Sequence, residues 1–558
     1  MVAAELPTNP VLGALWHRRL EHYPDTRPRM VQLGIVVVAT IVLYYEAYVA
    51  SAVAPSIIAS FGMSFPYYVY ITVVANAVGA FASLLAGLAD RWGRANLVAY
   101  GLGLTGLLTA FALPNAPTAF TFGLLSAVVG FVEGIILVAT PALVRDYSPQ
   151  IGRASAMGFW TLGPVVGSLV VAAVSSSTVA ALPNWQAQYV ICGIVGLVVF
   201  LIALVGLREL SPNLRDQLMV SHQDRALIEA RAAGVDVEQD RPWHQVLHLD
   251  VIGSAFAVAV FLIIYYTAVG FFTIYFTTIF GFGLAEANGI GNWFWAFDAI
   301  ALILVGIVSD RLGVRKPFML VGAVASVIMT IIFLTRGPGT SYTALVVITS
   351  LTAVSLGIAY APWMASFTET VERRNPALMA TGLAVWGWIV RVVVAVSIFI
   401  LPFVVSSMTP LVQYGAEVKA LSTQYAPQLQ TIAAVDPATL AALRTDPAAG
   451  AAAVGQIAQK LQVDAATATA RLQAVAAVPP RDLAFLKEHG TEVAAAAEQS
   501  ASQWRTWWWV CVGGELLFIP FVFVMSGRWS PRRAREDVAE HERRVAAELE
   551  RLERAPAP

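Results

Sequence analysis

Long apolar segments are the feature that most constrains what this chain can fold into. A membrane-spanning helix needs about 20 predominantly apolar residues. Twelve segments reach that length, at residues 31–55, 66–88, 95–113, 118–144, 154–180, 186–207, 251–280, 287–309, 317–335, 342–367, 378–405 and 506–527. Irregular backbone cannot face lipid, so each segment is predicted to be a helix. We therefore expect an all-α membrane protein with twelve transmembrane helices.

Composition supports this class and excludes others. The chain is 58% hydrophobic and 13% charged, whereas soluble domains carry about 25% charged residues. Its net charge of −1 gives no indication of nucleic-acid binding. Cys192 and Cys511 lie inside apolar segments and indicate neither a disulfide nor a metal site. No nucleophile stands with its base and no phosphate loop precedes a helix, so we expect neither an enzyme nor a bound cofactor.

Basic residues set the orientation of the chain in the bilayer. Arginines cluster in the loops on one side, and the positive-inside rule places both termini in the cytoplasm. We expect a multi-pass protein of the cell inner (plasma) membrane, and the excess of arginine over lysine is typical of a GC-rich bacterium. The predicted order is a cytoplasmic tail (1–29), a six-helix half (30–207), a cytoplasmic connector (208–250), helices 7–11 (251–408), an insert (409–505), helix 12 (506–527) and a charged cytoplasmic tail (528–558).

The insert at 409–505 is Ala-rich, has no spanning segment and falls outside the cell by topology. Asp436-Pro437 and Asp446-Pro447 each combine an N-cap residue with Pro at the first helical position. Asp464 and Asp482 are candidate caps for two more helices. We expect an extracytoplasmic helical insert between helices 11 and 12, and an envelope partner is one candidate for its surface.

One phrase occurs twice, as Asp90-Arg91-Trp92-Gly93-Arg94 and as Asp310-Arg311-Leu312-Gly313-Val314-Arg315. A small residue, Ala86 or Gly306, precedes each Asp by four positions, so the chain reads as a tandem duplication. The phrase resembles the loop signature of the major facilitator superfamily, which lies between the second and third helices of each half. This resemblance implies two pseudo-symmetric six-helix halves.

The resemblance also implies a set of gating contacts. The signature acid, Asp90, would meet the start of the eleventh helix at Asn375-Pro376 when the cytoplasmic gate is shut. Opposite charges at neighbouring helix ends suggest further ion pairs, of Arg91 or Arg94 with Asp146, and of Arg311 or Arg315 with Glu369 or Glu372. The predicted gating residues are Asp90, Arg91, Arg94, Asp146, Asp310, Arg311, Arg315 and Glu369, with a purely topological role of the arginines as the alternative.

Five ionisable residues lie inside the predicted spans, and such residues are costly and commonly functional. They are Glu46, Glu133, Asp298, Arg391 and Glu515, at similar depths. Burial and mutual repulsion favour the protonated forms of Glu46 and Glu133, which we predict to be proton-coupling residues; structural hydrogen bonding is the alternative. In the family the twelfth helix packs outside the cavity, so Glu515 is expected to be structural.

Arg391 needs an acidic partner at its depth, and Asp298 is the expected one. The pair would be either a structural link or a capture site for a substrate anion. Aromatic residues near these charges could stack on an aromatic or amphipathic ligand. The predicted substrate-binding residues are Tyr45, Trp295, Asp298, Trp388 and Arg391.

Local patterns bear on the branch of the family. Tyr44-Tyr45-Glu46-Ala47-Tyr48, followed by Pro55, is similar to the first helix of aromatic-acid and related metabolite:proton symporters. Gly163-Pro164-Val165-Val166-Gly167-Ser168 partly resembles the antiporter signature. The arginine that many proton-coupled members carry in the fourth helix is replaced by Gly130.

Three functions remain open from the sequence. The first is a proton-coupled symporter that imports a small, anionic or neutral, organic molecule across the lipid bilayer. The second is a proton-driven exporter of drugs or other amphipathic compounds. The third is a transporter-derived receptor or assembly platform that acts through 409–505. The sequence leaves the substrate and the oligomeric state open.

Overall fold

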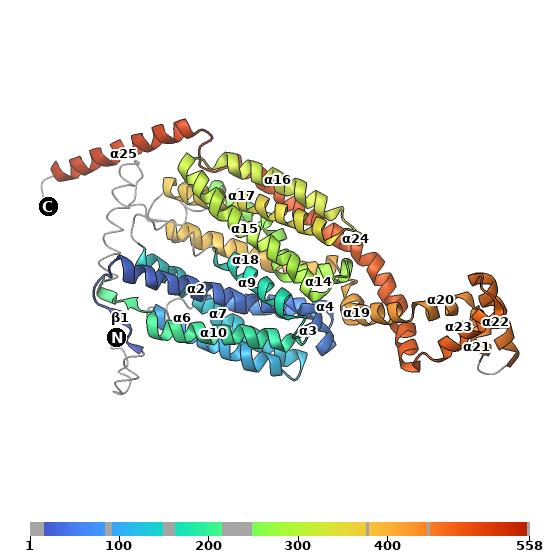
Figure 1. Cartoon of the computed structure of the whole chain (residues 1–558). Coiled ribbons are helices and arrows are strands. Elements are labelled where there is room, and N and C mark those ends of the chain that lie inside the picture. Colours follow the sequence, from blue (N-terminus) through green and yellow to red (C-terminus); the bar gives the residue numbers. More distant parts are fainter. Residues whose placement is uncertain are drawn as a thin grey trace.

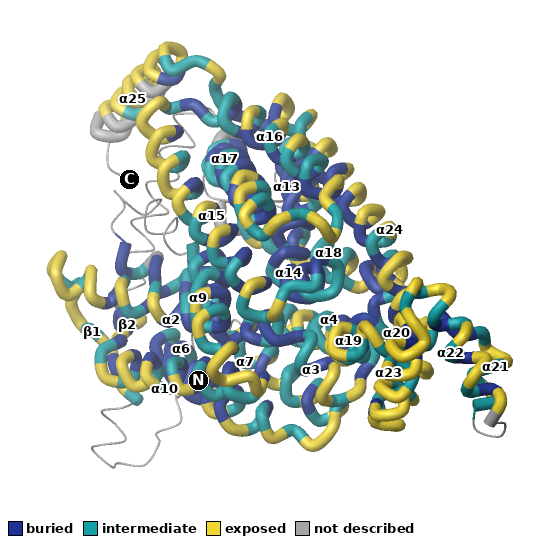
Figure 2. Tube along the Cα trace, turned by 45° about the vertical axis from the view of Figure 1, so that its right-hand side comes forward, coloured by how far each residue is buried: buried dark blue, intermediate teal, exposed yellow. Residues whose placement is uncertain are grey.

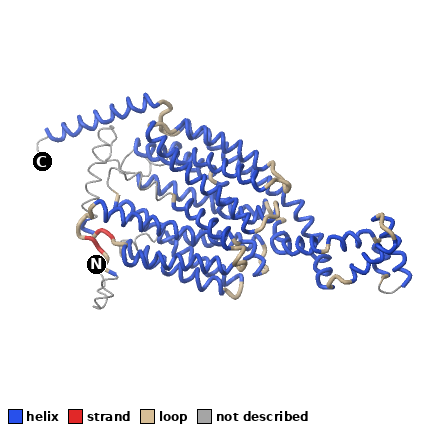
Figure 3. The backbone as a smooth tube through the Cα atoms, in the orientation of Figure 1, coloured by secondary structure: helices blue, strands red, loops and turns tan. Residues whose placement is uncertain are grey.

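The computed structural model describes residues 16–83, 92–148, 162–214, 248–374, 379–443 and 447–554. A bundle of long helices carries a narrower helical arm at one end, and the first and last described elements, β1 (Arg19–Leu20) and α25 (Pro531–Arg554), lie toward the other end (Figure 1). Apart from one pair of two-residue strands, the described regular structure is helical (Figure 3). The expected all-α architecture is confirmed for the described part of the chain.

The described residues of the N-terminal half form seven helices besides two short distorted segments. They are α2 (Thr26–Ala52), α3 (Ala54–Phe61), α4 (Phe65–Ser83), α6 (Arg94–Leu107), the π-helix η2 (Leu108–Ala112), the 3-10 turn η3 (Leu113–Asn115), α7 (Ala119–Tyr147), α9 (Gly163–Thr178) and α10 (Trp185–Gly206). The first span ends where Pro55 enters the first turn of α3, because Pro fits a helix start but not a helix interior.

The C-terminal half follows the same order of long helices. It contains the π-helix η4 (Leu249–Gly253), α13 (Ser254–Phe261), α14 (Ile263–Ile279), α15 (Leu284–Leu312), α16 (Lys316–Leu334), α17 (Tyr342–Arg374), α18 (Met379–Val404) and α24 (Pro480–Val524). The apolar interior is deepest at α14, where buried residues gather in the middle of the bundle (Figure 2).

Eleven helices of the described residues are long and apolar enough to cross a membrane. The fifth predicted span, 154–180, is described only from residue 162 on, and α9 is the shorter apolar helix found there. The other predicted spans correspond to helices of the bundle.

Close contact between α4 and α7 explains the glycine in the fourth span. A Cβ atom at Gly130 would stand 2.5 Å from the Ala75 carbonyl oxygen, and one at Gly79 would stand 2.7 Å from the Gly130 carbonyl oxygen. Small residues permit helices to approach this closely within a membrane. An arginine at position 130 would force the two helices apart.

The arm consists of α19 (Met408–Gln424), α20 (Ala426–Ala434), α21 (Pro437–Ala442), α22 (Pro447–Leu461), α23 (Ala465–Ala476) and the first part of α24. It has a small apolar core of its own around Val435 and Ile457. The last helix of the arm continues without interruption into the twelfth span, so the predicted boundary after residue 505 falls inside one helix.

Two predicted caps of the arm are confirmed. Asp436 and Asp464 accept hydrogen bonds from the backbone N–H groups of Thr439 and Thr467, at 2.9 and 2.8 Å. The bonds from Thr439, and one from Gln456, hold the pKa of Asp436 down at about 2. Asp446 lies outside the described residues.

Asp482 does not cap a helix as predicted. It lies in the first turn of α24, whose N-cap is Pro479, and it accepts a 2.9 Å hydrogen bond from the Tyr425 hydroxyl. Position 482 therefore ties the start of α24 to the end of α19.

Arg18 joins three segments at the end of the N-terminal half that lies away from the arm. Its guanidinium is 3% exposed and donates to the carbonyl oxygens of Ala203 and Leu204 near the end of α10, at 2.8 and 2.9 Å. It also donates to the Asn96 side chain at 2.8 Å. The bond to Leu204 satisfies a carbonyl group that the helix end otherwise leaves without a partner, whereas the Ala203 carbonyl also accepts from the Leu207 N–H.

The segment around Arg18 also forms the strand pair. Strand β1 (Arg19–Leu20) lies parallel to β2 (Glu209–Leu210), which follows α10. The start of the chain is thereby fixed to the beginning of the connector between the halves.

We expect Arg18→Ala to lower the free energy of unfolding by roughly 2 kcal/mol or more, because it removes charge-assisted hydrogen bonds from buried carbonyl groups. Arg19→Ala is the matched control, since that side chain is 41% exposed and its ion pair with Glu209 is 3.5 Å long. The control should change stability by less than about 1 kcal/mol. Thermal unfolding of both variants in detergent measures the difference, and equal melting temperatures would contradict this account of Arg18.

Candidate functional site

The first copy of the repeated phrase forms an ion pair at the end of the N-terminal half that lies away from the arm. Arg94 Nη1 lies 2.6 Å from Asp146 Oδ2 at the end of α7, and both side chains are largely buried. The Arg94 backbone N–H donates to Glu209 at 2.6 Å. Gly93 has φ +88°, and a Cβ atom there would stand 2.8 Å from the Glu209 carboxylate.

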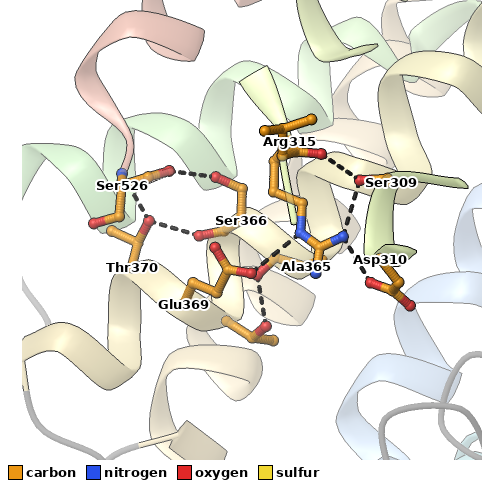
Figure 4. A network of polar contacts seen from close by, with 10 residues as sticks. Ser309, Asp310, Arg315, Ala365, Ser366, Glu369, Thr370 and Ser526 are labelled. Carbon is orange, nitrogen blue, oxygen red and sulfur yellow. Dashed lines mark hydrogen bonds and ion pairs between the residues drawn. The ribbon is translucent and has the colours of Figure 1, made fainter. Parts of the chain in front are cut away.

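The second copy repeats this arrangement in the C-terminal half, as Figure 4 shows. Arg315 Nε lies 3.1 Å from Glu369 of α17, and its Nη1 lies 2.6 Å from Asp310. Gly313 has φ +65°, so the glycine of each copy adopts a backbone conformation that favours glycine. The shared glycine and arginine are thus explained by one local geometry.

The predicted ion pairs Arg94–Asp146 and Arg315–Glu369 are confirmed. Arg311 is exposed. Asp90 and Arg91, the Asn375-Pro376 step and the side chain of Glu372 lie outside the described residues.

Midway along the bundle, five tyrosines from both halves gather around the interface. We call Tyr44 and Tyr48 of α2, Tyr265 and Tyr266 of α14, and Tyr360 of α17 the tyrosine cluster. The Tyr44 and Tyr48 rings are 5.5 Å apart, and those of Tyr265 and Tyr266 are 5.2 Å apart. Their hydroxyl groups make no hydrogen bond with another part of the described chain.

Charged groups of both halves border this cluster. Tyr44 lies within electrostatic reach of Tyr266, Arg391 and Glu133. Tyr360 and Tyr265 lie within reach of Asp298. One polar region therefore contains a guanidinium from α18, a carboxyl group from α7 and a carboxyl group from α15.

The expected pair between Arg391 and Asp298 is wrong for this structure. Arg391 is exposed, and its Nη1 donates to the hydroxyl of Ser83 at the end of α4, at 2.7 Å. Asp298 is 3% exposed and pairs with no basic side chain of the described residues. The rotation of α18 about its axis directs Arg391 toward α4, and sequence depth alone does not fix that rotation.

Glu133 belongs to the central region, whereas Glu46 lies behind it. The Oε1 atom of Glu133 is buried without a hydrogen-bond partner among the described residues. Glu46 is 4% exposed and points away from the interface, toward α6 and α10: Thr105 donates to its Oε2 at 2.6 Å, and its Oε1 abuts Gly196. The two carboxyl groups nevertheless interact electrostatically.

The neighbouring tyrosine follows the same division. Tyr45 is 1% exposed and faces the interior of the N-terminal half near Cys192. Tyr44 and Tyr48, four residues apart, share the helix face directed at the interface. The predicted substrate residue Tyr45 is thus set back from the central region, and sequence reasoning missed Tyr44, Tyr48 and Tyr360 as members of it.

The two predicted tryptophans, Trp295 and Trp388, differ in exposure. Trp295 is buried and packs edge-on against Tyr265, with ring centroids 5.2 Å apart. Trp388 is 66% exposed, one helical turn before Arg391. Trp363 and Trp386 pair 6.0 Å apart, and the indole N–H group of each is buried without a described partner.

Glu515 is remote from the central region and is held by hydrogen bonds. Its Oε1 accepts from Ser326 at 2.6 Å and from Thr330 at 2.9 Å, both on α16. This geometry agrees with the structural role expected for it.

The two halves meet at the outer end of the bundle, on the side of the arm. Asn288 of α15 donates to the Ala52 carbonyl oxygen at 2.9 Å, and Asn292 donates to Ser176 at 2.7 Å. At the opposite end the ion pairs of the described residues stay within one half. Among the described residues, hydrogen bonds therefore join the two halves at the end of the bundle that carries the arm.

Comparison with known proteins places this geometry in a family. Residues 36–397 match the model of the Major Facilitator Superfamily. A probable anion transporter 3, chloroplastic, of Oryza sativa subsp. japonica is 25% identical over 239 residues, which is 40% of this chain and 44% of the relative. The chain thus matches less than half of that relative's length.

Solved structures share the fold at low sequence identity. A bacterial homolog to the human lysosomal transporter Spinster, in an inward-facing and occupied conformation, superposes with TM-score 0.59 and 16% identity, over 90% of this chain and 97% of the other. A D-xylose-proton symporter superposes with TM-score 0.51 and 13% identity, over 69% and 96%.

The family model covers more than half of the chain, and the doubled loop and the two-half bundle agree with it. The chain belongs to the major facilitator superfamily and is a multi-span secondary transporter, not an enzyme.

Proposed function

We propose that this protein moves a small organic anion together with protons by alternating access, most simply as a symporter. Substrate would bind between the halves at the tyrosine cluster, in the middle of the membrane where secondary transporters commonly bind. We further propose twelve spans, with α9 as the described part of the fifth, and a bacterial plasma membrane with both termini in the cytoplasm.

The observation that carries the proposal is the separation of charges around Tyr44. Arg391 approaches this tyrosine from one half and Glu133 from the other, and neither makes an ion pair with the described residues. A guanidinium whose described partner is a neutral serine hydroxyl retains its charge for an incoming anion. A carboxyl group without a counter-ion favours binding a proton.

The chemistry at the cluster suits an acid with an aromatic or cyclic body. Tyrosine hydroxyls and the Arg391 guanidinium would donate hydrogen bonds to a carboxylate or a similar anion. The rings of Tyr265 and Trp295, and those of Tyr360 and Trp363, pack against one another and make the surroundings of the cluster apolar. A relative named as a probable anion transporter supports the same substrate charge.

Substrate and proton transport are coupled if Glu133 accepts its proton only when the substrate anion neutralises the charge of Arg391. Proton uptake by Glu133 and pairing of the anion with Arg391 leave the net charge unchanged, but they replace two separated charges by a neutral carboxyl group and an ion pair. This replacement lowers the cost of enclosing these groups between the halves. Glu46 would tune this step through its charge rather than carry the substrate-linked proton.

Export of amphipathic cations is the second candidate, favoured by one observation. Trp388 presents an exposed aromatic surface one turn from Arg391. Such a surface would also accept a flat cation, although Arg391 would repel it. The third proposal is a receptor or assembly platform that binds an envelope partner through 409–505. A transport assay in which no compound is transported would favour it.

We expect Glu133→Gln to abolish proton coupling. In proteoliposomes with an internal pH dye, the wild-type protein should acidify the interior when a transported organic acid is added outside, and Glu133→Gln should not. Glu46→Gln should retain acidification with a shifted pH dependence, because Glu46 acts on Glu133 through its charge.

The matched control for this assay is Glu515→Gln, since the amide oxygen preserves the bonds from Ser326 and Thr330. It should acidify like the wild type. Acidification retained in Glu133→Gln would refute the assignment of that residue, and alkalinisation with amphipathic cations would favour the exporter.

We expect Arg391→Ala to lower the apparent affinity for the transported acid roughly 10- to 100-fold, because the substitution removes one charge-assisted contact. Arg391→Lys should recover part of it. Ser83→Ala is the control, because it removes the neutral partner and keeps the guanidinium. Competition against uptake of the labelled acid measures the affinities, and wild-type affinity in Arg391→Ala would exclude anion capture by this residue.

A further inference from the structure

The first helix of the arm lies across the outer ends of both halves. α19 contacts α3 and α4 of the N-terminal half and α14 of the C-terminal half. Its position between the bundle and the rest of the arm is visible in Figure 1. The side chains that it buries are Met408, Leu411, Val412 and Val418.

α19 is fixed to the C-terminal half. It follows α18 after a short turn, in which the Ser407 N–H and hydroxyl donate to Gln503 of α24 at 3.1 and 2.7 Å. Further along, the Tyr414 ring stacks on His489 of α24 with centroids 3.8 Å apart.

The part of α24 that holds α19 is itself anchored in the same half. Trp504 and Trp508 are buried, and both rings lie close to Tyr275 of α14, at 5.0 and 5.2 Å. α19, α24 and α14 therefore move as one body with the C-terminal half.

On its other side α19 bonds to the N-terminal half. The Phe65 backbone N–H donates to Thr409 Oγ1 at 3.2 Å, and Gln413 Nε2 donates to the Met63 carbonyl oxygen at 3.0 Å. Both partners belong to the tight turn between α3 and α4, which begins at Gly62 with φ +58°. Both bonds thus join the arm to a single point on the opposite half.

We propose that Thr409 and Gln413 form an outer clasp, by which the insert holds the transporter closed on its outer side and sets how often that side opens. Opening toward the outside requires the outer ends of the halves to separate. Because α19 travels with the C-terminal half, the two bonds to the α3–α4 turn must break in every opening. The inference rests on the alternating access of the proposed function, but not on its substrate.

The clasp adds to direct contacts between the halves rather than replacing them. Asn288 still bonds to the Ala52 carbonyl oxygen when the clasp is removed. Two part-buried hydrogen bonds change an equilibrium by roughly tenfold in total. The clasp therefore adjusts the outward-open population without being required for folding.

The test is a distance distribution between spin labels on the outer ends of the two halves. Asn115→Cys and Thr335→Cys, both at exposed positions, carry the labels in a background where Cys192 and Cys511 are replaced by alanine. We expect the double variant Thr409→Val with Gln413→Leu to increase the long-distance, outward-open population roughly tenfold over the wild type.

Lys419→Ala is the matched control on the same helix. Its Nζ donates to the Gly281 carbonyl oxygen at 2.8 Å, a bond within the C-terminal half. This variant should leave the distribution unchanged. An unchanged distribution in the double variant, or an equal shift in Lys419→Ala, would overturn the clasp.

An inner label pair, Asn213→Cys with Leu312→Cys, separates this inference from the proposed function. Distances recorded in acidic and in alkaline buffer show whether the halves move at all. If pH changes the distances of the inner pair but the clasp variants leave those of the outer pair unchanged, the clasp is refuted and alternating access is not. If neither pair changes under any condition, alternating access fails and the clasp fails with it.

Discussion

The supply of polar partners within the apolar layer determines which buried carboxyl groups can change state. An ionised side chain at this depth is costly unless it is paired or hydrogen-bonded. Glu515 receives two hydroxyl donors and is held in place. Glu133 and Asp298 receive no counter-ion from the described residues, and the hydrogen-bond partner of Arg391 is a serine hydroxyl. This imbalance supports coupling of an anion to a proton at the centre of the bundle.

The two ends of the bundle differ in the polar contacts that they carry. At the end away from the arm, each copy of the repeated phrase pairs its arginine with an acid of its own half, which orders that half without joining it to the other. At the outer end, hydrogen bonds from Asn288 and from α19 cross between the halves. The arm thus contacts both halves of the transporter although it projects beyond the bundle.

The sequence predicted those features that local chemistry dictates. The repeated phrase predicted the family and an ion pair between each copy and an acid at a neighbouring helix end. It left open which arginine of each copy pairs, and the structure selects Arg94 and Arg315. The N-caps Asp436 and Asp464 followed from residue type and spacing. Depth along a helix was also readable, which placed Glu133, Asp298 and Arg391 in one layer.

Rotation about the helix axis was the quantity that the sequence could not supply. Tyr45 and Tyr44 are adjacent, yet one faces the core and the other the interface. The same limitation produced the wrong pair of Arg391 with Asp298, since packing of α18 against α4 decides where the guanidinium points. Arg18 was missed for another reason: its partners on α10 are separated from it by 185 residues or more, and nothing local predicts that contact.

Proton uptake on substrate binding tests the central claim most directly. The purified protein is titrated in a calorimeter with an organic acid that it binds, in buffers of different ionisation enthalpy. The dependence of the heat on the buffer counts the protons taken up for each anion. The account predicts uptake of about one proton by the wild type and none by Glu133→Gln, because the unpaired carboxyl group is the linked acceptor. Tight binding of the acid with no proton uptake by the wild type would contradict it.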